Sequence, residues 1–457
     1  MDIKTIIARP EGKQLEFKRD LSGRRNVLRT LCAFVNTAGG TIVFGVEDSG
    51  TVTGIADAID FEARLASIVS DGITPCVVPE IDIVAWRGAQ LVAVTVYPGP
   101  SRPYHVSALG PDAGAFVRVG STNRVADAEL RAELARVVRG ESYDEVPLPK
   151  LDVSAVDMAA AVAAFAPARR FGGQEARTLG IMASVGERVV PTVGGVLLFG
   201  VDRLATFPDA WLQAGRFRGA TKTHIADSID IVATLPGTVD QTLAFVKRSM
   251  SLEMRVEGTR RSEHWQFPLV AVREAVINAV VHADYSQKGA PIRVAVYDDR
   301  LEIENPGLLV PGLTVDDVVS GVSRLRNRVI GRVFRELGLI EQWGSGIGRM
   351  IGACRDAGLP DPTFEEIGGR FRVTIYSEQT AKPRLDDTDS AIVAAIGLVP
   401  GGLSTSQVAD TIGRSGRTAR TRLKQLATLG IVVELGTSPN DPQRRYLLAE
   451  DRAKYGR

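Results

Sequence analysis

The residues whose types and spacing best suit chemistry lie in the run Glu274-Ala-Val-Ile-Asn278-Ala-Val-Val-His282. Glu274, Asn278 and His282 are four residues apart, so on a helix they form one polar stripe. The residues between them are small and apolar, which predicts that the rest of this helix is buried. An amide oxygen can ligate a hard cation, and a carboxylate one turn away can orient or deprotonate a water. The stripe therefore predicts a site for magnesium and water beside a triphosphate.

Two later segments are expected to position ligands against this helix. The strand Arg300–Glu304 is paired with Arg293–Tyr297 through the turn Asp298-Asp299. It runs into a second turn, Asn305-Pro306-Gly307. A glycine cluster follows, Gly344-Ser345-Gly346-Ile347-Gly348, whose backbone amides can approach phosphate at the start of a helix.

The order of helix, strand with turn, and glycine cluster resembles the Bergerat-type nucleotide fold of the GHKL superfamily, most closely its RecG-like C-terminal branch. The resemblance implies an α/β sandwich with ATP and Mg²⁺ (or Mn²⁺) as cofactors. It implies that Glu274 is the catalytic or water-orienting acid and Asn278 the magnesium ligand. The phosphate loop would comprise Gly344, Gly346 and Gly348. The other expected nucleotide contacts are His282, Glu304, Asn305 and Gly307.

The chain departs from that family pattern at the adenine-reading turn. The usual Asp-x-Gly-x-Gly is here Glu304-Asn305-Pro306-Gly307, so the side chain that meets the adenine amine, and ATP hydrolysis, stay open. The segment with Arg324, Arg326, Asn327 and Arg328 corresponds to a lid whose charges suit a triphosphate. The alternative is a helix with a satisfied polar seam, a solvated loop and an ordinary glycine turn.

Residues 1–137 predict a compact α+β module with one early helix, Asn26–Val35. Its carboxylates Glu11, Glu16 and Asp48 flank that helix, and Lys18 shares a strand face with Glu16. Further motifs are Phe34–Gly40, Arg102-Pro103-Tyr104 and Phe116–Arg124.

This arrangement resembles the Schlafen AlbA-type domain, a nucleic-acid module. The resemblance implies that Glu11, Glu16 and Asp48 hold a divalent metal that could activate water against a phosphodiester. Lys18 would balance charge or grip phosphate. The alternatives are that Glu16 simply pairs with Lys18, that Asp48 makes a turn, and that the module only binds nucleic acid.

Residues 387–450 predict three short helices and a hairpin, the winged helix-turn-helix pattern. A Ser404–Gln407 capping box opens the second helix, and the third spans Arg417–Leu429. Arginine reads guanine edges and neutralises phosphates, so the basic residues predict DNA contact. They are Arg417, Arg420, Arg422 and Lys424 on the helix and Arg444 and Arg445 on the wing. A protein-binding winged helix with a solvated basic face is the alternative.

The bulk properties set the remaining expectations for this 457-residue chain. Polar segments at 138–150 and 378–387 are expected linkers, which leaves 150–380 as the nucleotide domain of an α+β multidomain protein. Within it we expect a strand at Gly194–Phe199 and a helix at Val239–Met254. The net charge of +1 excludes a globally basic nucleic-acid coat. Three separated cysteines argue against zinc and a disulfide framework.

No signal peptide, membrane span or Walker-type phosphate loop is evident, so a cytoplasmic protein without a motor site is expected. The leading hypothesis is an ATP-binding, DNA-binding transcriptional regulator whose nucleic-acid binding responds to nucleotide. The second is a metal-dependent Schlafen-like ribonuclease or nuclease in defence or stress, and the third a scaffold without either activity. DNA is the expected partner, RNA the alternative, and the resembled families imply a dimer.

Overall fold

The chain forms two compact units, Met1–Gln379 and Thr380–Arg457. The structure is a computed structural model that describes residues 3–7, 9–47, 50–166, 170–250, 252–257, 260–340, 345–377, 387–399, 402–428, 431–435 and 445–449. Asp48, Gly344 and Arg444, three of the expected site residues, lie outside these described residues.

The first part of unit 1 is built on a four-stranded sheet in the order β1-β2-β5-β4, in which β1 and β2 are parallel and the other pairs antiparallel. Its strands are β1 (Leu15–Lys18), β2 (Gly40–Phe44), β5 (Ala89–Val96) and β4 (Glu80–Trp86). Strand alternation sends Ile42 and Phe44 to one face and Val43 to the other. Both faces are therefore apolar and covered.

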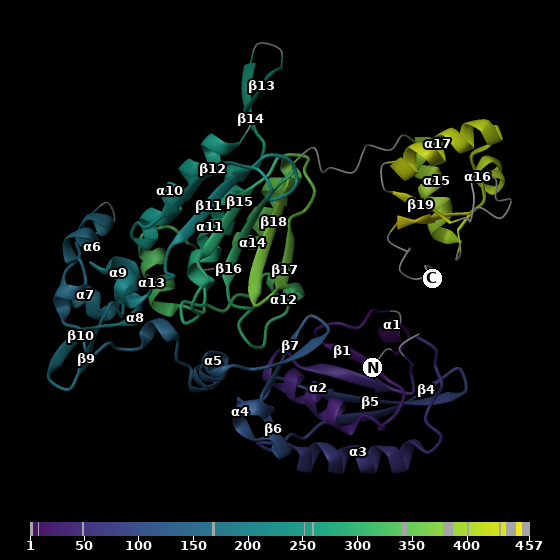
Figure 1. Cartoon of the computed structure of the whole chain (residues 1–457), viewed down its shortest axis with the longest axis horizontal. Helices are drawn as coiled ribbons and strands as arrows, with labels where there is room; N and C mark the ends of the chain where they lie inside the picture. Colours follow the sequence, from purple (N-terminus) through teal and green to yellow (C-terminus); the bar gives the residue numbers. More distant parts are fainter. Residues whose placement is uncertain are drawn as a thin grey trace. The chain divides into compact units, whose positions relative to one another are not determined.

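Helices α2 (Arg24–Asn36) and α3 (Ala58–Gly72) pack on the Phe44 face of this sheet (Figure 1). The expected early helix is confirmed as α2. Helix α3, which begins at the N-cap Asp57, was not expected. Two short antiparallel pairs also belong to this part: β3 (Ile73–Thr74) with β6 (His105–Val106), and β7 (Phe116–Val119) with β8 (Thr122–Val125).

The expected linker at 138–150 is packed structure. Helix α5 (Ala128–Arg139) ends at Gly140, which has a left-handed φ of 70°. Asp144 follows, fully buried, and accepts backbone N–H groups of Arg328 (3.0 Å) and Ile330 (2.9 Å). It thus caps helix α13 (Arg328–Glu336), because the first N–H groups of a helix lack partners within it. Burial raises the pKa of Asp144 to about 6, against the hydrogen bonds.

The second part of unit 1 is a six-stranded sheet in the order β12-β11-β15-β16-β18-β17. The pair β11–β15 is parallel and the others are antiparallel. The strands are β11 (Leu212–Phe217), β12 (Ile225–Ile231), β15 (Ile292–Val296), β16 (Arg300–Pro306), β17 (Thr363–Ile367) and β18 (Arg370–Tyr376). The expected hairpin at Asp298-Asp299 is confirmed by the β15–β16 pairing.

A layer of helices covers one face of this sheet (Figure 1): α10 (Leu235–Ser249), α11 (Leu269–His282) and α14 (Gly346–Asp356). Helix α11 is apolar around most of its circumference, and nine of its residues are buried, so it lies centrally in the core. A smaller group surrounds α8 (Val193–Phe199), with α6 (Met158–Phe165), α7 (Gly173–Thr178), α9 (Arg203–Thr206) and the hairpin β9–β10 (Met182–Val185, Arg188–Pro191).

Two expected elements of this region were wrong. Gly194–Phe199 is a helix, not a strand, because Thr192 caps it by accepting the Gly195 N–H and all seven residues of α8 are buried. A short apolar run fits a buried strand and a buried helix equally well. The helix expected to reach Met254 ends at Ser249, and β13 (Leu252–Glu257) pairs with β14 (Arg260–Trp265).

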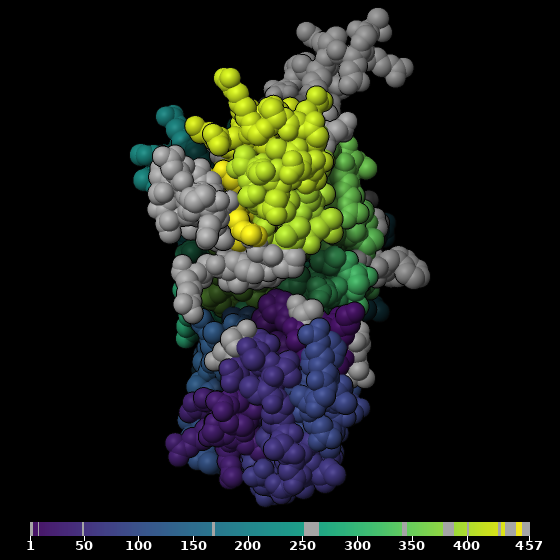
Figure 2. Space-filling view, turned by 90° about the vertical axis from the view of Figure 1, so that its right-hand side faces the viewer, coloured from purple at the N-terminus to yellow at the C-terminus, as the bar shows by residue number. Residues whose placement is uncertain are grey.

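Unit 2 consists of α15 (Asp387–Leu398), α16 (Thr405–Ile412), α17 (Gly416–Thr428) and the antiparallel pair β19 (Val432–Leu435) and β20 (Arg445–Leu448). Its apolar core includes Ile392, Leu423 and Tyr446. In the space-filling view these elements form one rounded yellow body (Figure 2). The expected three helices and terminal hairpin are confirmed, and the expected Ser404–Gln407 capping box is present.

Among the helices of the described residues, none combines the length and the apolarity that crossing a lipid bilayer requires.

Candidate nucleotide site and nucleic-acid surfaces

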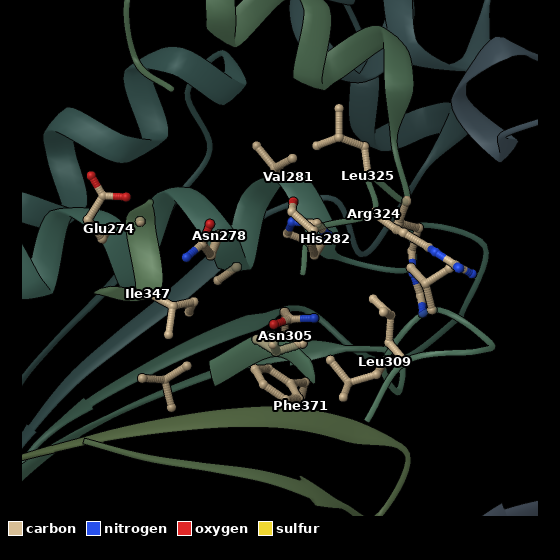
Figure 3. A pocket seen from close by; sticks show the side chains of 18 of the residues that line it. Glu274, Asn278, Val281, His282, Asn305, Leu309, Arg324, Leu325, Ile347 and Phe371 are labelled. Carbon is tan, nitrogen blue, oxygen red and sulfur yellow. The ribbon is translucent and has the colours of Figure 1, made fainter. Parts of the chain in front are cut away.

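Helix α11 presents its polar stripe to a cavity of about 170 Å³. Glu274, Asn278 and His282 follow one another along the wall of this cavity (Figure 3). The amide of Asn278 makes no hydrogen bond to another described residue, which leaves its oxygen available to a ligand. The stripe predicted from spacing thus lines one cavity.

Helix α14 begins directly opposite Glu274. A Cβ on Gly346 would lie 2.6 Å from Oε2 of Glu274, so a larger residue there would force the end of the Glu274 side chain to move. The N-cap residue Ser345 makes no side-chain cap, and Ser345, Gly346 and Ile347 line the cavity. The first turn of an eleven-residue helix therefore borders the same space as Asn278, and the N-terminus of a helix favours anions.

Glu274 is held by arginines. Its Oε1 accepts from Nη2 of Arg349 at 2.9 Å and lies 3.6 Å from Nη1 of Arg273, while its side chain is 7 % exposed. Arg349 also donates from Nη1 to the Ser345 hydroxyl at 2.9 Å. The carboxylate that the family resemblance assigns to water activation is thus already engaged.

Strand β16 places Asn305 in the cavity and Glu304 on the other face of the sheet. Glu304 accepts from Arg372 on β18, Nη2 to Oε1 at 2.6 Å, and does not line the cavity. Asn305 faces α11 with Phe371 beside it (Figure 3). Its amide nitrogen donates to the Pro306 carbonyl at 3.0 Å, which leaves the amide oxygen as an acceptor.

Gly307 ends this strand with a φ of +96°. A Cβ there would collide with the guanidinium of Arg326 and lie 2.8 Å from Cβ of Asp284. The positive φ and this crowding each require glycine at the position. Gly307 itself does not line the cavity, and its role is to let the expected lid segment approach.

The segment before α13 closes the cavity at the end opposite Glu274. Arg324, Leu325 and Arg326 line it, and Figure 3 shows Arg324 and Glu274 at its two extremes. Asn327 is buried and donates to the carbonyls of Val281 (2.9 Å) and Ala283 (2.8 Å), which fixes the segment to the end of α11. Arg328 instead bonds the Gly140 carbonyl, away from the cavity.

His282 occupies the middle of the cavity wall as a neutral imidazole. Burial, and next the positive charge of Arg326, lower its pKa to about 4. A neutral imidazole can both donate and accept, so His282 suits a polar edge of a base or sugar better than a phosphate.

The expected metal ligands of the N-terminal module have protein partners. Glu16 is buried and accepts from Arg118, and its other oxygen lies 2.6 Å from Nζ of Lys18. Oε1 of Glu11 accepts the backbone N–H of Phe17 at 2.7 Å. No group of three His, Cys, Asp or Glu that could hold a metal occurs among the described residues. Because Asp48 is not among them, the expected trio stays a prediction, and the contacts of Glu16 favour a charge-balancing role.

On α17 the basic residues divide between solvent and core. Arg417, Arg420 and Lys424 are exposed, whereas Ala419 and Leu423 are buried. Arg422 turns inward, and its Nη1 donates to Oδ2 of Asp389 on α15 at 3.0 Å. On β20, Arg445 is exposed and donates to the Gly402 carbonyl at 3.2 Å. Of the four basic residues of α17 that were expected to contact DNA, three are therefore exposed: Arg417, Arg420 and Lys424.

Sequence reasoning missed Arg349, Leu309 and Phe371 as cavity residues. The signal for Arg349 is its position one turn into the helix that follows the glycine cluster, on the side of Ser345. Leu309 and Phe371 carry no local signal, because their role depends on strand pairing and on the path of the chain after Gly307.

The six-stranded sheet and its helix layer thus hold a cavity beside α11, with the start of α14 on its wall. Residues 289–375 match the family model described as "Putative ATP-dependent DNA helicase recG C-terminal", and residues 11–127 match the Schlafen, AlbA_2 model. The chain thus carries a Schlafen AlbA_2 domain and a RecG-like C-terminal ATPase domain.

Two solved structures are similar to the chain. The DIP2311 protein from Corynebacterium diphtheriae is 21% identical, with 98% of this chain and 96% of that one covered and a TM-score of 0.43. The N-terminal domain of a "Putative ATP-dependent DNA Helicase RecG-related Protein" from Nitrosomonas europaea is 26% identical over 28% of this chain and 92% of that one, with a TM-score of 0.22.

Proposed function

We propose that this chain binds ATP in the α11 cavity and DNA through unit 2, and acts as a nucleotide-responsive regulator, in the first instance of transcription. The observation that carries the nucleotide part is the convergence of Asn278, Asn305 and the start of α14 on one cavity. These residues come from three elements far apart in sequence, and each offers the polar group that one part of a nucleotide requires.

In the proposed complex the triphosphate lies against the start of α14, where the N–H groups of the first helical turn can bind it. Asn278 would hold Mg²⁺, which when bound would neutralise phosphate charge. Asn305, through its free amide oxygen, would accept from the adenine amine in place of the usual aspartate. Glu274 would orient a water only when released by Arg349.

Ligand binding tests this assignment. We expect ATP with magnesium to bind the full-length protein, measured by calorimetry, and Asn278→Ala to weaken binding about tenfold by removing the cation ligand. Asn26→Ala, an exposed asparagine of α2, is the matched control. Equal affinity of the wild type and Asn278→Ala would refute the magnesium site, and absence of ATP binding by the wild type would refute the function.

The DNA part rests on the exposed basic face of α17 and on the fold pattern of unit 2, which we interpret as a winged helix. Arg417, Arg420 and Lys424 lie along one helix face, with the opposite face packed in the core. The regulatory step requires ATP to favour one arrangement of the two units over another. A DNA titration with and without ATP measures it, and identical affinities would exclude nucleotide control.

A further inference from the structure

Two arginines from distant parts of unit 1 meet at Gly312, outside the proposed triphosphate position. Arg102 belongs to the N-terminal module, and Arg324 to the segment between α12 (Val315–Val319) and α13. Gly312 has a φ of +98°, and the point that its Cβ would occupy is 3.0 Å from Nη1 of Arg324 and 4.0 Å from Nη1 of Arg102. The two guanidinium groups therefore flank one small space.

Neither guanidinium is neutralised within the described part of the chain. Nε and Nη1 of Arg102 are buried and have no hydrogen-bond partner there, and neither arginine forms an ion pair with a described residue. Burial, followed by the charge of Arg324, lowers the pKa of Arg102. Buried charged groups are normally paired, because an unpaired one costs much free energy. The unpartnered guanidinium of Arg102 therefore indicates a missing anion, and the exposed Arg324 beside it adds a second positive charge.

The neighbouring charged groups are already engaged. Lys13 lies 2.6 Å from Oε2 of Glu366. Asp317, the acid close enough to feel Arg324, accepts the Thr314 backbone N–H at 2.9 Å and its hydroxyl at 2.7 Å as part of a capping box. Asp317 thus forms no ion pair with Arg324 within the described residues, and no described acid forms one with Arg102.

We propose that Arg102 and Arg324 form a binding site for a phosphate group of a small ligand, separate from the triphosphate position at α14. Planar guanidinium groups bind phosphate oxygens through paired hydrogen bonds. Arg324 lines the cavity at the end opposite Glu274 (Figure 3), so a phosphate at this end belongs to a different part of a ligand, or to a different ligand, than one at α14.

The burial of Arg102 favours a small ligand over a nucleic-acid backbone. Two of its guanidinium nitrogens have no contact with solvent, so a polymer lying on the surface would not reach them. A terminal phosphate is small enough to contact them once the exposed side chain of Arg324 moves aside. The site goes beyond ATP binding, since it uses none of Asn278, Asn305 or the start of α14.

The test is calorimetry and thermal unfolding of the full-length protein with two probes, pyrophosphate and adenosine 3′,5′-bisphosphate. We expect both to bind, and Arg324→Gln to weaken each about tenfold or more by removing a charge-assisted contact. Arg324 is exposed, so this variant is expected to fold. Binding of pyrophosphate alone identifies a free phosphate as the ligand, and tighter binding of the bisphosphate identifies a nucleotide that spans the cavity.

Three further variants separate this site from the others. Arg370→Gln removes a half-buried arginine that already donates to the Pro291 carbonyl, and we expect no loss of binding. Gly346→Ala perturbs the α14 end, so pyrophosphate binding that remains in this variant is assigned to Arg102 and Arg324. Arg102→Gln should abolish binding and raise the unfolding midpoint without ligand, because it relieves repulsion.

The proposal fails if pyrophosphate binds Arg324→Gln as tightly as the wild type, or if neither probe binds the wild type. It also fails if Arg324→Gln weakens only oligonucleotide binding, which would assign the arginines to a nucleic-acid backbone.

Discussion

Nη2 of Arg349 lies 2.9 Å from Oε1 of Glu274, and this ion pair joins the first turn of α14 to the middle of α11. Two arginines contact Oε1 of this carboxylate, whose side chain is 7 % exposed, and they hinder it from orienting a water. We therefore expect Arg349→Gln to raise the rate of ATP hydrolysis several-fold. A change of this size corresponds to the net free energy of one hydrogen bond, about 1 kcal/mol. Phosphate release under saturating ATP measures it.

The control for that variant is Arg355→Gln, on the same helix but paired with Asp361 at the surface. The gain should vanish in a Glu274→Gln, Arg349→Gln double variant. An unchanged or lower rate for Arg349→Gln would show that Arg349 binds nucleotide itself or that Glu274 is no base.

Gly346 and Gly348 form a matched pair on one helix. A methyl group at Gly346 meets the Glu274 carboxylate, whereas one at Gly348 meets nothing within 4 Å. We expect Gly346→Ala to lower ATP affinity about tenfold by displacing the start of α14 from the cavity. Gly348→Ala should bind normally and unfold at an equal or higher temperature, because alanine stabilises a helix by about 1 kcal/mol relative to glycine. Equal affinities for both variants would exclude α14 from the site.

His282 predicts a pH dependence of stability. Its pKa is about 4 in the folded protein and 6.5 in the absence of structure. Between these values the unfolded chain binds a proton that the folded protein does not. The free energy of unfolding therefore falls as the pH decreases from 6.5 to 4. We expect His282→Gln to remove this contribution.

Chemical denaturation at several pH values compares the two proteins. Asp144 has a raised pKa and contributes the opposite slope between 3.8 and about 6, but it is present in both. The difference between the wild type and His282→Gln isolates the histidine. A difference that does not vary with pH would contradict the lowered pKa of His282.

We expect Glu16 to raise the free energy of unfolding of the protein. Arg118, 1 % exposed, would lose its buried counter-charge in Glu16→Gln, at a cost of about 3 kcal/mol. Lys18→Gln breaks the more exposed partner contact and should cost less than about 1 kcal/mol. Denaturant unfolding measures both. Wild-type stability of Glu16→Gln, together with loss of metal-dependent RNA cleavage, would instead support the nuclease hypothesis.

The basic helix of unit 2 offers a test that separates binding from folding. Arg417→Ala and Arg420→Ala should each weaken DNA binding and reduce the salt dependence by about one counterion. Arg422→Ala should instead destabilise unit 2, because Asp389 loses its partner. If Arg422→Ala alone reduces DNA affinity in a normally folded protein, the assignment of the helix faces is wrong.

The predictable parts of this molecule are those with a strong local pattern. The four-residue spacing in α11 identified three cavity residues, and alternation in β16 identified a strand. That alternation also implies that Glu304 and Asn305 face opposite ways, but only the position of the core shows which of them faces the cavity. Capping and breaking signals located α16 and α17.

The parts that were not predictable depend on contacts between distant segments. Helix α8 is set by Thr192 and by burial on all sides, which an apolar hexapeptide does not reveal. Asp144 reads as part of a polar linker, yet it caps a helix 184 residues later. The meeting of Arg102 with Arg324 has no sequence signal of any kind.

Glu366 holds two parts of the chain at once: Oε2 accepts from Lys13, 353 residues away, and Oε1 accepts the Leu309 backbone N–H at 2.8 Å. Leu309 in turn lines the nucleotide cavity. A fragment limited to residues 150–380 would keep every cavity residue but lose Lys13 as the counter-charge of Glu366. Nucleotide affinities measured on such a fragment would describe a cavity in which the wall at Leu309 has lost part of its support. Dividing this protein at its apparent domain boundaries therefore changes the nucleotide affinity that is measured.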